Sequence, residues 1–450
     1  MAGAAWLPVA LFAVSTCGGD LEERPLELSA THSTPERLRF TASLRDVAGA
    51  AVVGALTPVL SWEVGGADSD LIHVADVEVT SEGHVAILDR GSQRIVVLDS
   101  AGSRLRKIGR RGEGPGEFLS PFALADVGEA LVVWDSRVST PLTRLDLADR
   151  APVVSGPPIP GDWLQVQLRG QRSFMEEPAR WGWEDLTRRI DGSPDGRVAH
   201  LIQPDESNPP PGFDLRAPVA TIVEYDGEFH IIDTLARMSA PEIESERIGA
   251  GLERFNQPLF APRPLFALGD GWTAFAHGDS AFVTVLSLQK DTVAVIEFPD
   301  GDRRIREHER YAYVDWNIEE SVLKGSSEQR SRFAAQSRKQ IEQGRRALAY
   351  DQFAFSDVTP SISAIYAVGD CLWLSGFNAI DNPDGTGAAW VAVRIRPSLD
   401  LMGVLDFAKP GIRVRDFGAT SVVATVRDEN GIVRVHRYSL PNPLHCRPPG

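Results

Sequence analysis

The sequence predicts an all-β protein, a six-bladed β-propeller of four-stranded antiparallel blades with a short helical insertion. Short apolar segments bounded by turn residues recur along the 450 residues. Two aspartates that end such segments, Asp89 and Asp135, lie 135 − 89 = 46 residues apart. That spacing is close to the roughly 40–45 residues at which propeller blades repeat. Helical periodicity is weak except in residues 303–350, so strands account for most of the chain.

The first blade can be followed strand by strand in residues 83–111, GHVAILDRGSQRIVVLDSAGSRLRKIGRR. Apolar strands at 85–88 and 94–98 are separated by turn residues, and a third strand follows. Residues 131–135 (LVVWD) and 142–147 (LTRLDL) repeat this pattern and predict the second blade.

The later blades are predicted from the same succession of apolar runs and turns. The expected strands are 163–168, 197–203, 217–225 and 228–235 in the third blade, 265–268, 272–277, 282–288 and 293–298 in the fourth, 362–368, 372–375, 390–396 and 401–407 in the fifth, and 412–416, 421–427 and 433–440 in the sixth. The sixth blade thus lacks a strand, while residues 59–64 (VLSWEV) form a strand without a blade. We expect this segment to complete the sixth blade, because closure removes a bare sheet edge.

Residues 107–118 (KIGRRGEGPGEF) are rich in glycine, but no helix is expected after them, which argues against a phosphate-binding loop. We interpret them as a tight connector between blades, with Phe118 entering the next core. The segment resembles the blade connector of the bacterial six-bladed propeller family related to NHL repeats, and the similarity extends over roughly residues 57–440. Members of that family are typically secreted or attached to the cell envelope and mostly lack an assigned activity. The resemblance therefore implies a fold and a compartment.

The composition bounds the possible partners. Acidic residues number 62 and basic residues 46, which gives a net charge of −16. Non-specific nucleic-acid binding needs a basic surface, so we expect no nucleic-acid partner. Hydrophobic residues make up 43% of the chain, enough for a sizeable core, and we expect a monomer.

The N-terminus predicts export. Residues 2–16 are uncharged and mostly apolar, but they are too few for a membrane span of about 20 residues. Cys17 and its neighbours resemble a bacterial lipoprotein signal, in which this cysteine is lipidated; plain secretion and a cytoplasmic location are the alternatives. The expected parts are a signal peptide (1–17), a membrane tether (18–56), the propeller (57–440) and a C-terminal tail (441–450).

The two remaining cysteines, Cys371 and Cys446, suit a disulfide in an oxidising compartment. The bridge would close a loop of 446 − 371 = 75 residues, worth ~4 kcal/mol on chain-entropy grounds. Two unpaired thiols are the alternative.

Residues 303–350 are rich in Arg, Glu, Gln and Ser, and Gly325 and Gly344 interrupt them, so two short helices are expected. A sparse apolar stripe would lie on the propeller, comprising Val322, Phe333, Ile341 and Leu348. The insertion is interpreted either as a lid over a site or as a surface decoration.

The chemistry-bearing residues are few. Asp76, Asp126 and Asp416 lie on or near the strands expected to line the central channel. Convergent carboxylates there could hold calcium, as in lactonase-like propellers; solvated channel polarity is the alternative, and no other cofactor is expected. Four strand tryptophans are interpreted as packing between blades, namely Trp134, Trp272, Trp373 and Trp390.

These observations favour an extracytoplasmic binding or scaffold module for an unknown protein, glycan or small-molecule ligand, located in the bacterial cell envelope or secreted. A membrane contact is expected only through a lipid anchor. The alternative is a metal-dependent hydrolase or lyase of the lactonase type in the propeller channel. Convergent carboxylates beneath the insertion would favour that enzyme.

Overall fold

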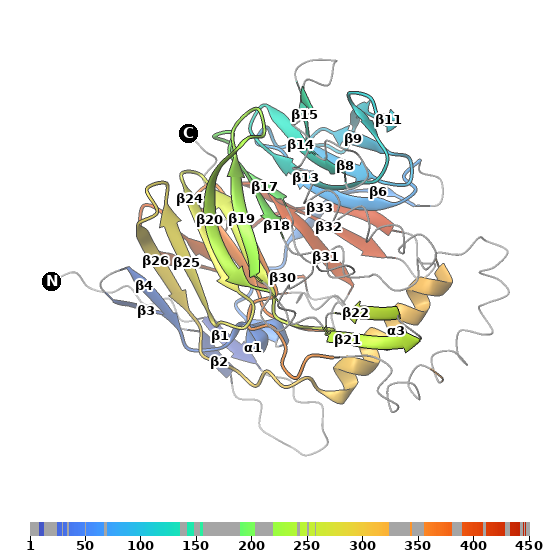
Figure 1. Cartoon of the computed structure of the whole chain (residues 1–450). Helices are drawn as coiled ribbons and strands as arrows, with labels where there is room; N and C mark the ends of the chain where they lie inside the picture. The colour runs from blue at the N-terminus through green and yellow to red at the C-terminus, as the bar shows by residue number, and fades with distance from the viewer. Residues whose placement is uncertain are drawn as a thin grey trace.

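The computed structural model contains, within the residues it describes, six four-stranded blades of a β-propeller (Figure 1). This confirms the predicted fold class. No helix in the described part of the chain is both long and apolar enough to span a membrane. The described residues are 9–12, 25–28, 30–33, 36–49, 51–66, 70–135, 142–147, 154–155, 190–202, 219–240, 244–249, 252–256, 258–323, 343, 355–379, 389–407, 411–427, 433–441, 444 and 446.

Each blade starts at an innermost strand and steps outward along the chain, because the first strands of successive blades contact one another in a closed ring. The first blade contains β7 (Val74–Val79), β8 (Val85–Asp89), β9 (Arg94–Leu98) and β10 (Arg104–Ile108), the second β13 (Pro121–Asp126), β14 (Ala130–Asp135), β15 (Leu142–Asp146) and β16 (Val154–Ser155), and the third β17 (Ile190–Gly192), β18 (Val198–Ile202), β19 (Val219–Tyr225) and β20 (Ile231–Ser239). The fourth blade contains β23 (Pro264–Gly269), β24 (Trp272–His277), β25 (Phe282–Ser287) and β26 (Thr292–Glu297), and the fifth β27 (Ala364–Val368), β28 (Cys371–Ser375), β29 (Ala389–Arg394) and β30 (Asp400–Asp406). The sixth blade contains β31 (Ile412–Phe417), β32 (Ser421–Arg427) and β33 (Val433–Ser439), together with β6 (Val59–Gly65) from the N-terminal side.

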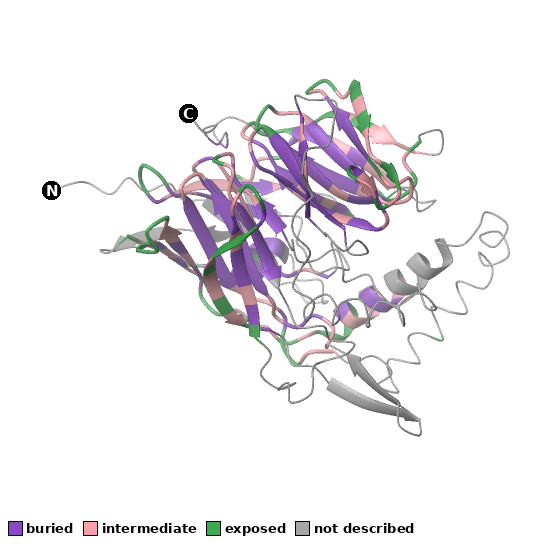
Figure 2. Ribbon diagram, turned by 45° about the horizontal axis from the view of Figure 1, so that its top comes forward, coloured by how far each residue is buried: buried purple, intermediate pink, exposed green. Residues whose placement is uncertain are grey.

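The core lies between the stacked blades, where both faces of the middle strands are buried (Figure 2). The four strand tryptophans are at most 1% exposed, which confirms their predicted packing role. Trp373 stacks on Phe417 of the next blade with ring centroids 4.2 Å apart. Aromatic contacts of this kind join neighbouring blades.

The repeated aspartates Asp89 and Asp135 have the same structural role in the first two blades. Each is at most 1% exposed and ends the second strand of its blade. Asp89 accepts backbone hydrogen bonds from Ile72 and His73, and Asp135 accepts them from the two residues that precede β13. The carboxylate thus satisfies backbone donors where the chain enters the blade.

The connector after the first blade is a tight turn, as predicted. Its short strands β11 (Arg110–Arg111) and β12 (Glu117–Phe118) pair in parallel. Phe118 is fully buried in the core between the first two blades. A Cβ on Gly109, which has φ +91°, would lie 2.5 Å from the Phe118 ring, so only glycine fits there.

Strand β6 pairs antiparallel with β33 and supplies the outer strand of the sixth blade. This confirms the predicted closure of the ring. The chain end that precedes the first blade and the last strand of the final blade therefore form one sheet.

Much of the predicted tether is part of the folded domain instead, which corrects the 18–56 assignment. Strand β4 (Arg37–Phe40) adds in parallel to β26 at the edge of the fourth blade, and β3 (Ala30–Ser33) pairs with β4. Helix α1 (Leu44–Gly49) then contacts β28 and β29. The hydrophobic side chains described between residues 38 and 48 of this N-terminal segment (residues 36–65) are buried, so burial of apolar area overrides the polar composition there.

Three more strands lie in the N-terminal region. Strand β1 (Val9–Phe12), within the predicted signal peptide, pairs with β2 (Pro25–Leu28) and β5 (Ala51–Val53). Cys17 lies outside the described residues, so its lipidation stays a prediction.

One expected strand of the third blade differs from the structure. The innermost strand of the third blade is β17, whereas the expected strand at 163–168 lies outside the described residues. The C-terminal tail, 441–450, is held against the domain at Leu444 and Cys446, which are at most 2% exposed. Cys446 forms a disulfide with Cys371 across a Cα separation of 5.7 Å.

The insertion contains helix α3 (Glu307–Leu323), and a hairpin of β21 (Glu244–Gly249) and β22 (Leu252–Asn256) lies in the preceding connection. The predicted break at Gly325 and the later part of the apolar stripe lie outside the described residues. Within α3, Tyr313 and Val314 are the described buried hydrophobic side chains.

Deleting residues 57–65 should destabilise the whole propeller, because β33 would become a bare edge and the ring would lose its closure. We expect a clear fall in melting temperature by calorimetry, together with a greater tendency to aggregate. An unchanged melting temperature would refute the closure.

Candidate functional site

The three aspartates predicted to face the channel lie on innermost strands, on β7, β13 and β31 respectively. Each accepts a hydrogen bond from the backbone of a neighbouring blade. The bonds are Leu124 N to Asp76 Oδ2 (2.9 Å), Ser81 N to Asp126 Oδ2 (3.0 Å) and Val79 N to Asp416 Oδ2 (2.8 Å). The carboxylates therefore bridge adjacent blades around the centre.

Two more buried carboxylates do the same and were missed from the sequence. Glu78 Oε1 accepts the Asp126 N–H at 3.0 Å, and Asp191 Oδ2 accepts the Leu268 N–H at 2.8 Å. Glu78 follows Asp76 by two residues and so lies on the same strand face, a signal that the sequence did contain. We call Asp76, Glu78, Asp126, Asp191 and Asp416 the inner carboxylates.

The inner carboxylates satisfy backbone N–H groups where innermost strands meet edge to edge without a ladder between them. Such donors would otherwise be buried without acceptors, at a cost of about 1–3 kcal/mol each. In the described part of the chain, no group of three or more His, Cys, Asp or Glu is arranged to hold a metal ion. The calcium site and the metal-dependent hydrolase or lyase stay predictions.

Asp126 differs from the other inner carboxylates in its second oxygen. Its Oδ1 is buried without a hydrogen-bond partner, and the side chain is 7% exposed. Burial, with a further contribution from the Asp416 charge, raises the pKa of Asp126 from 3.8 to about 7. This carboxyl therefore takes up a proton at a higher pH than a solvent-exposed aspartate does.

The two faces of the propeller differ in their connections. The first and second strands of every blade are joined by two to five residues. Connections between blades emerge on the opposite face, since each blade has an even number of antiparallel strands. Two of these connections hold described elements: β21–β22 lie between β20 and β23, and α3 lies between β26 and β27. Figure 1 places these elements together on one side of the blades. We call it the long-connection face.

Helix α1 also lies on the long-connection face. Asn378, in the loop between β28 and β29, donates a hydrogen bond to the Ala48 carbonyl at 2.9 Å. A Cβ on Gly376 would lie 2.2 Å from the Leu44 carbonyl oxygen, so glycine permits this close approach. The N-terminal segment thus reaches the same surface as the insertion.

A buried ion pair joins α1 to the start of α3. Arg45 Nη2 lies 2.6 Å from Glu309 Oε1, and the two side chains are 8% and 5% exposed. Arg45 Nη1 also donates to Thr359 Oγ1 at 2.6 Å, and Glu309 Oε2 accepts the Arg306 N–H at 2.8 Å. Glu309 therefore also caps the first turn of α3.

An aromatic cluster holds α3 against the blade loops. Phe260 packs edge-to-face on Tyr313 of α3 and on Phe377, with ring centroids 5.4 and 4.9 Å apart. Val314 and Ala379 complete its buried part. The insertion therefore has a defined docking position on the long-connection face, through residues distant in sequence.

No protein-family model matches the chain, and no curated protein matches it. Solved structures similar to it include a protein described as exported from Bacteroides fragilis, at 10% identity and TM-score 0.39, covering 84% of this chain and 95% of the other. Virginiamycin B lyase from Staphylococcus aureus, solved with quinupristin, is 7% identical with TM-score 0.36, covering 97% and 99%. The β-propeller domain of Cps50 (Swd1) from Myceliophthora thermophila is 9% identical with TM-score 0.32, covering 85% of this chain and 100% of the other. These likenesses bear on the fold alone.

Replacing Asp126 with Asn should change how stability depends on pH. The folded state binds the Asp126 proton more tightly than the unfolded chain, so stability from this group falls as pH rises from about 4 to about 7. A shift of this size corresponds to about 4 kcal/mol at most. We expect Asp126→Asn to gain stability relative to wild type at pH 8 but not at pH 4, by urea unfolding.

The control for this prediction is Asp416→Asn, which removes the charge that helps to raise the Asp126 pKa. It should weaken the pH dependence without abolishing it. An identical pH dependence in wild type and Asp126→Asn would contradict the proton on Asp126.

Breaking the Arg45–Glu309 pair should detach the insertion. Arg45→Met leaves Glu309 buried without its partner, a change that costs about 3–5 kcal/mol in comparable pairs. The double variant Arg45→Met/Glu309→Met should recover much of that stability. Arg434→Met, at a half-exposed pair with Glu63, is the matched control and should have little effect. Equal effects of Arg45→Met and Arg434→Met on the urea midpoint would argue against the buried pair.

Proposed function

We propose that the protein is an extracytoplasmic binding or scaffold module that presents its long-connection face to a protein, glycan or small-molecule ligand. The main support is the asymmetry of the two faces. Helix α1, the β21–β22 hairpin and α3 gather on one face, while short turns join the first two strands of each blade on the other. Loops held on a rigid scaffold are the usual location of binding residues.

The disulfide supports the compartment in this proposal. Cys371 and Cys446 are both 2% exposed and bonded to each other. Structural disulfides persist in oxidising compartments and are rare in reducing cytosol. A location in the cell envelope, with lipidation of Cys17, is the finer form of the proposal, as is kinship with propellers related to NHL repeats.

The docking of α3 supports a binding role over a surface decoration. A decorative helix needs no buried ion pair, yet Arg45 and Glu309 are nine-tenths buried and paired. Such pairs cost desolvation energy and suit a segment whose position matters. The insertion thus has a fixed place among the loops of the proposed binding face.

Replacing residues 305–357 with a short Gly-Ser linker tests the proposal. Arg304 and Val358 already face each other in a β-bridge, so the linker need span only a short distance. We expect ligand binding, screened with glycan arrays and envelope extracts, to be lost. The matched control is Glu82→Lys/Glu228→Lys, in turns of the opposite face, which should bind normally. Binding that survives the deletion but fails in the control would overturn the proposed face.

A further inference from the structure

The base of the insertion contains an arginine whose hydrogen bonds are incomplete. Arg303 Nε donates to the Thr359 carbonyl at 2.9 Å, and Nη1 donates to the Asp279 carbonyl at 2.6 Å. Its Nη2 is buried without a hydrogen-bond partner, and the structure shows no ion pair for Arg303 in the part of the chain that it describes. The half-buried guanidinium thus keeps one unsatisfied donor and has no carboxylate partner among the described residues.

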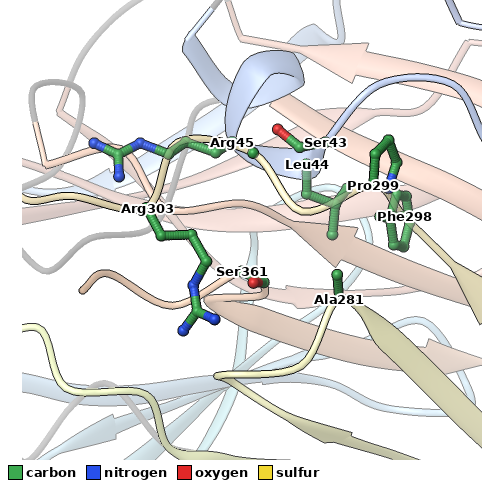
Figure 3. Close-up of a pocket in the computed structure, with 9 residues that line it drawn as sticks. Ser43, Leu44, Arg45, Ala281, Phe298, Pro299, Arg303 and Ser361 are labelled. Atoms are coloured by element: carbon green, nitrogen blue, oxygen red, sulfur yellow. The ribbon is translucent and has the colours of Figure 1, made fainter.

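A second unsatisfied polar atom lines the same pocket. Ser361 Oγ is buried without a partner, while its backbone N–H donates to the Gly278 carbonyl at 2.6 Å. In Figure 3 the Ser361 hydroxyl lies beside the Arg303 side chain, and both line one pocket. Two donors at one cavity leave a position for a species that accepts both.

The other polar side chains around the pocket are already committed. Ser43 Oγ bonds the Asp46 carboxylate at 2.6 Å, and Arg45 is paired with Glu309. The remaining walls are largely apolar and include Leu44, Ala281, Phe298 and Pro299. The charge left over at the pocket is therefore the positive charge of Arg303.

The cavity is small, with a volume of about 10 Å³, which is room for roughly one water-sized species. A sulfate or a sugar phosphate is too large. A monatomic anion, although larger than a water molecule, can accept from both donors and offset the positive charge of Arg303. A neutral water can also accept from both donors, but it adds no negative charge beside the half-buried guanidinium of Arg303.

We propose that this pocket binds one monatomic monovalent anion, chloride, between the guanidinium of Arg303 and the hydroxyl of Ser361. The site connects the two ends of the insertion, because the Thr359 N–H donates to the Arg303 carbonyl at 2.7 Å. A bound anion therefore stabilises the docked insertion. The proposal stands independently of the ligand of the long-connection face.

The test uses the full chain, with bromide and chloride as probes. Crystals soaked in bromide should show one anomalous peak between Arg303 and Ser361. In solution, the melting temperature should rise with chloride or bromide along a saturating curve. Gluconate at the same ionic strength, which is too large for the pocket, should produce no such rise.

Variants separate the site from general salt effects. Ser361→Ala, which keeps the fold and the charge, should raise the apparent Kd for bromide about tenfold, as expected for loss of one hydrogen bond to an ion. Arg303→Lys should weaken binding further. Arg306→Gln, an exposed arginine three residues along, is the control and should leave the curve unchanged. An ordered water without anomalous signal, or equal effects of bromide and gluconate, would overturn the proposal.

Discussion

Closure of the ring is the constraint on which the rest of this structure depends. A propeller built from sequential blades has two chain ends, and each exposes unpaired backbone unless another strand covers it. Here β6 pairs with β33 and joins both ends in one sheet. The same N-terminal segment also covers the outer edge of the fourth blade through β4 and contacts the fifth blade through α1. One stretch of chain therefore fastens three consecutive blades.

At the centre, the innermost strands meet without a shared hydrogen-bond ladder, which would leave backbone N–H groups without acceptors. Acidic side chains accept these hydrogen bonds instead. The inner carboxylates accept backbone N–H groups across blade junctions, as the Asp76–Leu124 and Asp416–Val79 bonds illustrate. Near the entry to the first two blades, Asp89 and Asp135 apply the same chemistry. Buried acids in this protein thus serve mainly to complete backbone hydrogen bonds. Asp126 is the exception, because one of its oxygens has no such role.

The long-connection face combines rigid support with inserted chain, which is the arrangement that binding surfaces on scaffolds use. The buried Arg45–Glu309 pair and the aromatic cluster around Phe260 fix the start of α3 on that face. Ring closure and insertion docking are linked, since the N-terminal segment contributes to both. A substitution in that segment is therefore expected to affect packing both at the blade edges and at the proposed binding face.

Local periodicity and turn chemistry were enough to predict the blade pattern, the closing strand at 59–64, the tight connector and the burial of the tryptophans. The cysteine spacing did not decide between a Cys371–Cys446 disulfide and two unpaired thiols. Only the tertiary structure decided that residues 36–49 fold onto the blades, that Glu78 and Asp191 join the inner carboxylates, and that Arg45 meets Glu309, 264 residues away. Residues 20–45 are polar and charged, which suggests a tether, yet buried apolar side chains such as Leu38, Phe40 and Leu44 anchor this segment to the blades. Contacts between distant segments produce no periodic pattern in the sequence of either segment. They can therefore be identified only from the folded structure.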